Sequence, residues 1–355
     1  MIKKIVVIPG DGIGPEITEQ AVKICRAAAE GSEIDLAFET KYAGGAAIDR
    51  YGEPLPEDTL EVCRGADAIL LGAVGGPAWD HVAPALRPEK AILGLRKALG
   101  LYANLRPVRV FPALVSHAPL KAEVVTGVDM MLVRELNGGI YYGSRSESEI
   151  VNGVEEAWDT ELYNTAEVTR IVRLAAQIAA KRQSSVVSVD KANVLASSRL
   201  WRRTAETVVR EFPNIKLNHL YVDNCAMQIV LAPTQFDVIV TNNLFGDILS
   251  DEAAVITGSI GMLPSASIGD GPGLYEPIHG SAPDIAGQGI ANPLGTILSA
   301  AMMFRYSLGA EEIAVKIEQA VEKVLAEGYR TADLFKQGSS KVTTDEMGQQ
   351  VLNHL

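Results

Sequence analysis

Short apolar runs and helical patterns alternate along almost the whole chain, and this alternation constrains the fold more than any other feature. Residues 5–8 (Ile-Val-Val-Ile) predict a buried strand, and residues 15–30 carry apolar side chains at helical spacing, beginning with a proline. The same two patterns recur at residues 186–189 and 200–212. Strands that alternate with helices predict an α/β fold with a largely parallel sheet.

Other segments complete the pattern, and short strands near residue 140 make the expected sheet a mixed one. Further strands are predicted at residues 34–38, 68–71, 129–133, 140–142, 215–222 and 238–241. Further helices are predicted at residues 89–99, 166–182, 224–231, 247–254, 296–307 and 311–326. Thr343 and Glu346 have the spacing of a capping box before a last helix. Residues 258–293 form a long loop rich in glycine and proline.

Composition narrows the class of protein. A chain of 355 residues predicts about two domains, and 47% hydrophobic against 21% charged residues excludes a disordered chain. The net charge of -12 argues against a nucleic-acid or anionic-membrane partner. Three scattered cysteines, no signal-peptide pattern and no apolar stretch of membrane length predict a reducing, cytoplasmic location.

A glycine-rich turn at residues 10–15 (Gly-Asp-Gly-Ile-Gly-Pro) separates the first predicted strand from the first helix. Its spacing does not match the dinucleotide fingerprint Gly-x-Gly-x-x-Gly, and no Gly-Lys-Ser/Thr follows it. The spacing therefore favours a tight strand-to-helix turn over a phosphate cradle.

Arginines and acids suggest two kinds of ligand. Residues 87–109 carry a net charge of +5, and Arg96, Arg106 and Arg134 are suited to bidentate carboxylate binding, with surface ion pairs as the alternative. Asp247 and Asp251 share one face of a predicted helix, where like charges repel unless neutralised. Oxygen ligands of this kind select Mg²⁺ or Mn²⁺, and Asp223 could supply a third ligand. The alternative is that the two acids lie in the first turn of a helix, where the helix dipole stabilises negative charge.

Three further features suit proton transfer and nucleotide binding. Lys191 follows a predicted strand, at the edge where α/β enzymes place their sites, and a partly desolvated lysine can act as a base. Tyr141 follows Gly138-Gly139 and could donate a proton. Asp284, in the loop at residues 276–287, could accept hydrogen bonds from two ribose hydroxyls. The alternatives are a surface lysine, a core tyrosine and a flexible loop.

Taken together, these motifs resemble the β-decarboxylating dehydrogenases, the isocitrate/isopropylmalate dehydrogenase family, and within it the isopropylmalate branch. The resemblance runs from residues 10–16 to the helix after Asn292, and its most specific block is residues 242–252 (Asn-Asn-Leu-Phe-Gly-Asp-Ile-Leu-Ser-Asp-Glu), continuing to residues 258–266. It implies NAD-dependent oxidative decarboxylation of (2R,3S)-3-isopropylmalate to 4-methyl-2-oxopentanoate and CO₂ in leucine biosynthesis. Oxidation of isocitrate, homoisocitrate, tartrate or D-malate stays open, as do a non-catalytic regulatory subunit and a metal-dependent phosphate-ester enzyme.

The resemblance also implies a two-domain α/β fold with mixed parallel and antiparallel sheets, distinct from a Rossmann fold. Residues 1–101 and 258–355 would form the cofactor-binding domain. Residues 102–257 would form an inserted domain for dimerisation and substrate binding, with an arm near 143–160. Such a protein works as a homodimer with shared active sites and has no nucleic-acid or membrane partner.

The residue roles that the resemblance implies fall into four groups. Tyr141 is the proton donor and Lys191, from the neighbouring subunit, is the base. The substrate contacts are Arg96, Arg106, Arg134, Asp223, Glu89, Ile92, Leu93 and Val194, of which the aliphatic ones suit an isopropyl group. The NAD contacts are Glu276, His279, Gly280, Ser281, Ala282, Asp284, Ile285 and Asn292. The Mg²⁺ or Mn²⁺ ligands are Asp247, Asp251 and Asp223 of the neighbouring subunit.

Overall fold

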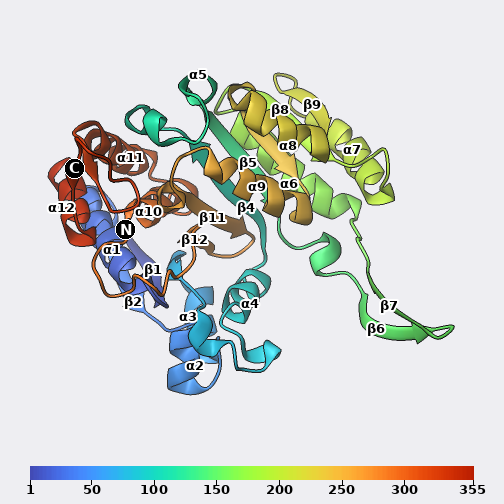
Figure 1. Ribbon diagram of the computed structural model, residues 1–355, viewed down its shortest axis with the longest axis horizontal. Coiled ribbons are helices and arrows are strands. Elements are labelled where there is room, and N and C mark those ends of the chain that lie inside the picture. Colours follow the sequence, from blue (N-terminus) through green and yellow to red (C-terminus); the bar gives the residue numbers. More distant parts are fainter. The chain divides into compact units, whose positions relative to one another are not determined.

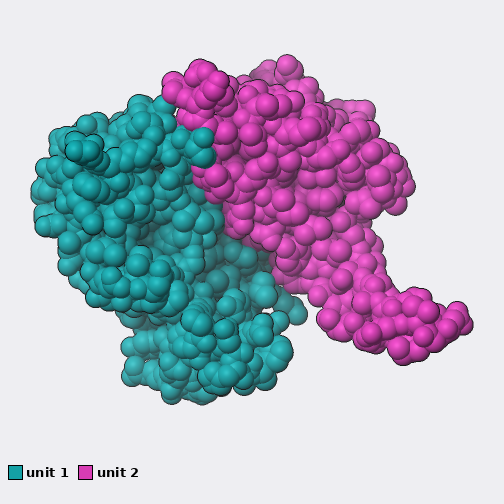
Figure 2. Space-filling model, in the orientation of Figure 1, with its two compact units in different colours: residues 1–101, 111–119, 257–355 teal, residues 102–110, 120–256 magenta.

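The computed structural model describes residues 1–355, which divide into two compact units (Figure 2). Unit 1 comprises Met1–Leu101, Phe111–Pro119 and Thr257–Leu355, and unit 2 comprises Tyr102–Val110 and Leu120–Ile256. The segment at residues 111–119, which the family resemblance placed in the inserted domain, packs with unit 1. None of the helices combines the length and apolar character that a membrane-spanning helix requires.

Unit 1 contains five strands of a mixed sheet (Figure 1), in the order β2-β1-β3-β12-β11. Their bounds are β1 Ile2–Gly10, β2 Asp35–Thr40, β3 Ala68–Ala73, β11 Pro264–Gly269 and β12 Gly273–Pro277. β1 pairs in parallel with β2 and β3, β3 pairs in parallel with β12, and β12 pairs antiparallel with β11. The parallel pairs and the antiparallel pair together confirm the predicted mixed α/β fold class.

Helices cover both faces of this part of the sheet. Their bounds are α1 Gly14–Ala29, α2 Gly45–Tyr51, α3 Glu57–Arg64, α4 Lys90–Ala98, α10 Leu294–Tyr306, α11 Glu311–Ala326 and α12 Thr344–Asn353. Val6, Ile8, Ile69 and Leu71 pack in one buried cluster with apolar residues of α3 and α4. Alternate strand residues point to the other face, where α1 and α10 contact β3 and β12. The predicted capping box of α12 is present.

Unit 2 contains five strands in the order β4-β5-β10-β8-β9. Their bounds are β4 Leu101–Arg109, β5 Asp129–Glu135, β8 Ser185–Asp190, β9 Lys216–Tyr221 and β10 Val238–Thr241. The helices are α5 Ala122–Val125, α6 Thr165–Ala179, α7 Ala196–Val209, α8 Val222–Leu231 and α9 Asn243–Val255. β5, β10, β8 and β9 are mutually parallel, so their carboxyl ends meet at one edge.

A hairpin of β6 Arg145–Val151 and β7 Val154–Asp159 projects from the body of unit 2 (green in Figure 1). Most of its residues are exposed, and its tip turns at Asn152 and Gly153, both with positive φ. It occupies the stretch in which the family resemblance placed an arm.

Some local predictions are wrong. Residues 140–142 are not a strand, because Gly139 has a φ of 77° and begins the 3-10 turn Gly139–Tyr141. The loop at residues 258–293 contains β11 and β12, and every residue of β12 is buried. Helix α9 begins at Asn243, where Asn242 caps it by accepting a hydrogen bond from the amide of Phe245, so Asp247 is not in its first turn.

Candidate active site

The carboxyl edge of the parallel strands in unit 2 gathers several of the residues predicted to act in catalysis, substrate binding and metal binding. Arg134 lies near the end of β5, Lys191 directly follows β8, and Asp247 lies on α9, which follows β10. Asp223 lies in the first turn of α8, which follows β9. Open α/β sheets place ligands at such an edge.

Tyr141, Arg134 and Asp247 form one hydrogen-bonded group. The Tyr141 hydroxyl donates to Oδ2 of Asp247 over 2.5 Å, and the Arg134 guanidinium donates to Oδ1 of the same carboxylate. The Arg134 guanidinium lies 5.7 Å from the centre of the Tyr141 ring. Gly246 makes this approach possible, because a Cβ there would lie 2.6 Å from Cγ of Arg134.

The surroundings of this group shift the pKa values of Asp247 and Tyr141 in opposite directions. Burial alone raises the pKa of Asp247, but the charge of Arg134 and the hydrogen bond from Tyr141 outweigh it and hold that pKa below its usual range. Burial, followed by the hydrogen bond to Asp247, raises the pKa of Tyr141. Near neutral pH the group therefore consists of an ionised carboxylate and a protonated phenol, as a proton donor requires.

Arg106 makes a second arginine–aspartate pair on the same helix. Its Nη1 donates to Oδ1 of Asp251 over 3.0 Å and to Oγ of Ser250 over 2.6 Å, while its Nε donates to Oδ1 of Asn104 over 2.7 Å. The Asp251 side chain is 71% exposed. Each acid of the predicted metal pair is thus neutralised by an arginine of the predicted substrate clamp, which removes the expected repulsion between the acids.

Lys191 and Asp223 form a separate ion pair, with Nζ 2.8 Å from Oδ1. The lysine hydrogen bond lowers the pKa of Asp223. No hydrogen bond or ion pair joins this pair to Tyr141, Asp247 or Asp251. Within one chain, no cluster of three or more His, Cys, Asp or Glu side chains suitable for a metal ion is formed.

Several buried polar residues that the sequence did not single out hold this edge in place. Asn243 accepts hydrogen bonds from Nε and Nη2 of Arg134 over 3.1 and 2.8 Å and donates to the carbonyls of Leu136 and Gly138. The Tyr163 hydroxyl accepts from the Asn243 amide. The only sequence signal was the pair of asparagines directly after an apolar strand.

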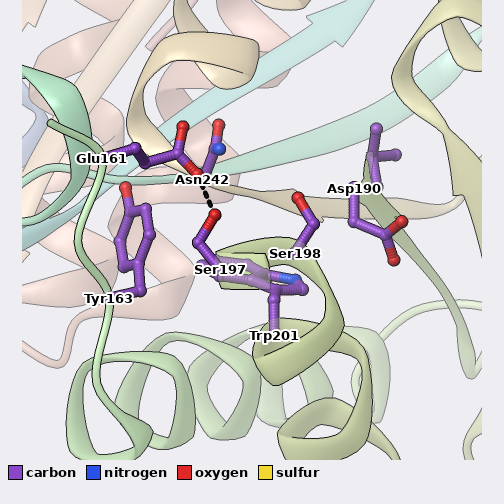
Figure 3. A pocket seen from close by; sticks show the side chains of 8 residues that line it. Glu161, Tyr163, Asp190, Ser197, Ser198, Trp201 and Asn242 are labelled. Carbon is purple, nitrogen blue, oxygen red and sulfur yellow. Dashed lines mark hydrogen bonds between the residues drawn. The ribbon is translucent and has the colours of Figure 1, made fainter. Parts of the chain in front are cut away.

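A small pocket lies next to Lys191 (Figure 3), where Ser197 points at Glu161 with Oγ 2.6 Å from the carboxylate. Ser198 accepts a hydrogen bond from the Lys191 amide over 3.0 Å, and the buried Asp190 is paired with Arg202. These bonds fix the backbone from which the Lys191 side chain extends.

In unit 1, α4 presents the predicted substrate-facing residues and Arg96. Nη2 of Arg96 donates to Oε1 of Glu276 over 2.9 Å, and its Nε is buried without a hydrogen-bond partner. Leu93 is 42% exposed, whereas Ile92 packs partly against the core of unit 1. Glu89 is exposed and its Oε1 lies next to Gly75. Val194, in unit 2, is 62% exposed.

The loop that follows β12 packs tightly on the glycine-rich turn. The Ile13 amide donates to the Ser281 carbonyl over 2.8 Å, and a Cβ at Gly12 would lie 2.0 Å from that carbonyl oxygen. Gly12 is therefore required for close backbone approach, as expected of a tight turn. Ala282 adopts a φ of 39°, and Ile285 packs with Ile13 against a small apolar cluster.

Some polar side chains in this loop have hydrogen-bond partners within the chain, and others do not. Nε2 of His279 is buried without a partner, and burial lowers the pKa of this histidine. Gly280 and Asp284 are exposed, and nothing occupies the space where a Cβ of Gly280 would lie. Asn292 is engaged by the chain itself, because it accepts from the Leu294 amide and donates to Asp333. The unpaired His279 nitrogen and the exposed Asp284 suit a polar ligand, while Asn292 acts structurally here.

A family model described as isocitrate/isopropylmalate dehydrogenase matches residues 4–351. The chain belongs to this family. Similar members of the isocitrate/isopropylmalate dehydrogenase family include the 3-isopropylmalate dehydrogenases of Clostridium pasteurianum, 61% identical over 354 residues, and Moorella thermoacetica, 59% identical over 353 residues. Each of these alignments covers 99% of both chains.

Solved structures within the same family share the fold. An isocitrate dehydrogenase from Methylococcus capsulatus has a TM-score of 0.86 at 35% identity and covers 99% of both chains. A beta-decarboxylating dehydrogenase from Thermococcus kodakarensis has a TM-score of 0.83 at 38% identity, covering 99% of this chain and 96% of its own. The predicted family membership is therefore confirmed over the full length.

Proposed function

We propose that this chain catalyses the NAD-dependent oxidative decarboxylation of (2R,3S)-3-isopropylmalate to 4-methyl-2-oxopentanoate and CO₂, as a cytoplasmic enzyme of leucine biosynthesis. The observation that carries the proposal is the group of Tyr141, Arg134 and Asp247, in which a protonated phenol, a guanidinium and a carboxylate share hydrogen bonds. The names of the full-length relatives at 54–61% identity support the choice of substrate.

The arginines orient the substrate. Arg96, Arg106 and Arg134 are the proposed ligands of the two malate carboxylates, as charge-assisted hydrogen-bond donors. In the structure Arg106 and Arg134 donate to Asp251 and Asp247 instead. Substrate binding therefore exchanges internal ion pairs for ion pairs with the ligand, and it releases the two aspartates to act as acceptors.

The donor sets fit the cofactors that the family uses. Asp247 and Asp251, completed by Asp223 of a second copy, offer carboxylate oxygens of the kind that Mg²⁺ or Mn²⁺ prefers. Asp284, the unpaired His279 nitrogen and Glu276 would contact NAD, together with the backbone of Gly280, Ser281, Ala282 and Ile285. When bound, the metal lowers the pKa of the substrate hydroxyl and stabilises enolate charge, and NAD⁺ accepts the hydride from carbon 2.

Two residues move protons. Nζ of Lys191, once released from Asp223, is the group that accepts the proton of the 2-hydroxyl as the C2–H bond breaks. The resulting 3-carboxy-2-oxo acid loses its 3-carboxyl group as CO₂, and the bonding electrons pass into the enolate. The Tyr141 hydroxyl then gives its proton to carbon 3. Its raised pKa keeps that proton in place until the enolate forms.

A homodimer would bring Lys191 and Asp223 of one copy to Tyr141 and Asp247 of the other. Helices α8 and α9 pack on each other and expose large apolar side chains, which support such an assembly. The exposed residues are Met227, Leu231, Ile248 and Val255, each more than half exposed. The β6–β7 hairpin adds Ile150 and Val154. Exposed apolar surface of this extent is typical of a protein interface.

The decisive experiment is NADH production from 3-isopropylmalate by the purified chain. Turnover is expected with Mg²⁺ and NAD⁺. It is expected to be much lower after chelation of the metal, or when NADP⁺ replaces NAD⁺. Isocitrate and D-malate serve as alternative substrates. Isocitrate is expected to react poorly, because Ile92 and Leu93 are aliphatic where its third carboxylate would need polar contacts, and D-malate because it lacks the isopropyl group. Preference for isocitrate, or no NADH from any of the three acids, contradicts the proposal.

A further inference from the structure

The segment that carries Tyr141 runs between β5 and the β6–β7 hairpin, and its first half is anchored to unit 2. The buried Glu135 carboxylate accepts hydrogen bonds from the amides of Asn137 and Gly138 over 2.9 and 2.7 Å. The Gly139 amide donates to the Leu162 carbonyl over 3.1 Å. These contacts fix the residues before Tyr141. Within the turn, the amides of Tyr142 and Gly143 donate to the Gly139 carbonyl over 3.2 and 3.1 Å, which leaves the carbonyl groups of Ile140 and Tyr141 to other donors.

One side chain binds the carbonyl groups of both residues. Nη2 of Arg145, the first residue of β6, donates to the carbonyl oxygens of Ile140 and Tyr141, each over 3.0 Å. Arg145 is paired in register with Asp159, the last residue of β7, and its Nε lies 3.4 Å from Oδ1 of that aspartate. The root of the hairpin is therefore bonded to the backbone of the tyrosine.

The second half of the segment has little freedom to replace this contact. Gly143 runs so close to the strand leaving the hairpin that a Cβ there would lie 1.7 Å from the Thr160 carbonyl oxygen. The Tyr141 side chain itself is 43% exposed, so packing alone does not fix its ring. Its hydroxyl must nevertheless reach Asp247 within hydrogen-bond distance.

We propose that Arg145 is a positioning residue that holds the Tyr141 backbone so that the phenol points at the reacting carbon. This inference rests on the proposed role of Tyr141 as proton donor. Arg145 contacts only the backbone of the tyrosine and therefore acts through its position. A misplacement of about 1 Å can reduce a rate by about 100-fold, so loss of this clamp slows proton delivery more than hydride transfer.

The test compares Arg145→Ala with Arg145→Lys, Asp159→Asn and the matched control Arg173→Ala. Arg173 is a partly exposed arginine of similar accessibility, bonded to Glu211 on the surface of unit 2. Two quantities are measured with 3-isopropylmalate, NAD⁺ and Mg²⁺ in D₂O. These are the rate of NADH formation in a single turnover and the rate of 4-methyl-2-oxopentanoate formation, with the stereochemistry of deuterium at carbon 3 read by NMR.

Arg145→Ala is expected to slow product formation at least about tenfold relative to NADH formation and to scramble the deuterium between the two positions at carbon 3. Arg145→Lys and Asp159→Asn are expected to give smaller effects in the same direction, and Arg173→Ala none. If Arg145→Ala does not fold, the Lys and Asn variants decide the matter. The inference would be overturned if the folded Arg145 and Asp159 variants formed NADH and 4-methyl-2-oxopentanoate at equal rates and placed deuterium at a single position of carbon 3. Absence of NADH with the unmodified protein would instead refute the proposed function.

Discussion

Two acid–partner pairs lie at the same sheet edge of unit 2, and they are built differently. Asp247 is 38% exposed, lies within α9 and accepts hydrogen bonds from both Arg134 and Tyr141. Asp223 is 62% exposed, lies in the first turn of α8 and has Lys191 as its partner. The first pair is pre-organised by several elements of one chain. The second depends on one exposed contact, as expected of groups that act on a site completed by another copy.

Replacing Lys191, the proposed base, tests this contrast most severely. Lys191→Met keeps an aliphatic side chain but removes the amine, so NADH formation from 3-isopropylmalate is expected to fall about 10³-fold, within the range of general-base effects. Circular dichroism and thermal melting should match the unmodified protein, because the lysine head group is near the surface. Substantial NADH formation by the folded variant would exclude Lys191 as the base.

Replacing Tyr141, the proposed proton donor, separates the two chemical steps. Tyr141→Phe keeps the ring but removes the proton that the raised pKa of the hydroxyl retains, so net decarboxylation is expected to slow about 10²-fold. Single-turnover NADH formation should change much less. Stopped-flow absorbance and product analysis measure the two rates. Equal slowing of both steps would show that the tyrosine serves binding rather than proton transfer.

A mixed dimer tests whether the two pairs meet across a subunit interface. Lys191→Met and Tyr141→Phe chains with different affinity tags are co-expressed, and the doubly tagged species is purified. If each site takes its tyrosine and lysine from different copies, one of the two sites is intact and activity is expected to recover to about half. Activity no higher than the mean of the two single variants would place both residues of a site on one chain.

Stability against pH provides the smallest expected difference. The lowered pKa of Asp247 means that its carboxylate stabilises the fold above about pH 4, and this contribution is lost as the pH falls through the acid range. Asp247→Asn is expected to lower the free energy of unfolding by about 1 kcal/mol at pH 7, allowing for solvent screening, and by less at pH 3. Asp223→Asn should show no measurable change. Urea titrations of both variants at pH 7 and pH 3 measure the free energy of unfolding. Equal losses of stability in the Asp247 and Asp223 variants would remove the distinction between the two pairs.

The sequence predicts the architecture well where the signal is periodic. The four-residue apolar run at residues 238–241 and the helix at residues 311–326 match β10 and α11 in full. Residues 140–142 mislead because Gly139 turns the chain where an apolar and aromatic run suggests a strand. β11 and β12 escape prediction because they lie in a stretch rich in glycine, proline and serine, where the extended form depends on pairing with neighbouring strands.

The sequence predicts which types of side chain form the site, but not which of them pair with one another. Spacing identifies Asp247 and Asp251 as two acids on one helix face. It does not reveal that arginines distant in sequence neutralise them, because those contacts depend on strand order. The backbone clamp of Arg145 has no motif, since any residue at a strand start can face its own preceding turn.

Gly246 has a practical consequence for anyone who wishes to engineer this protein. Its missing side chain lets α9 lie against the stem of Arg134, since even a methyl group would meet that stem at 2.6 Å. Randomised libraries that vary residue 246 to enlarge the site would therefore displace the helix bearing both aspartates. Diversity is better introduced at Leu93 and Val194, whose exposed side chains can change size without moving the main chain.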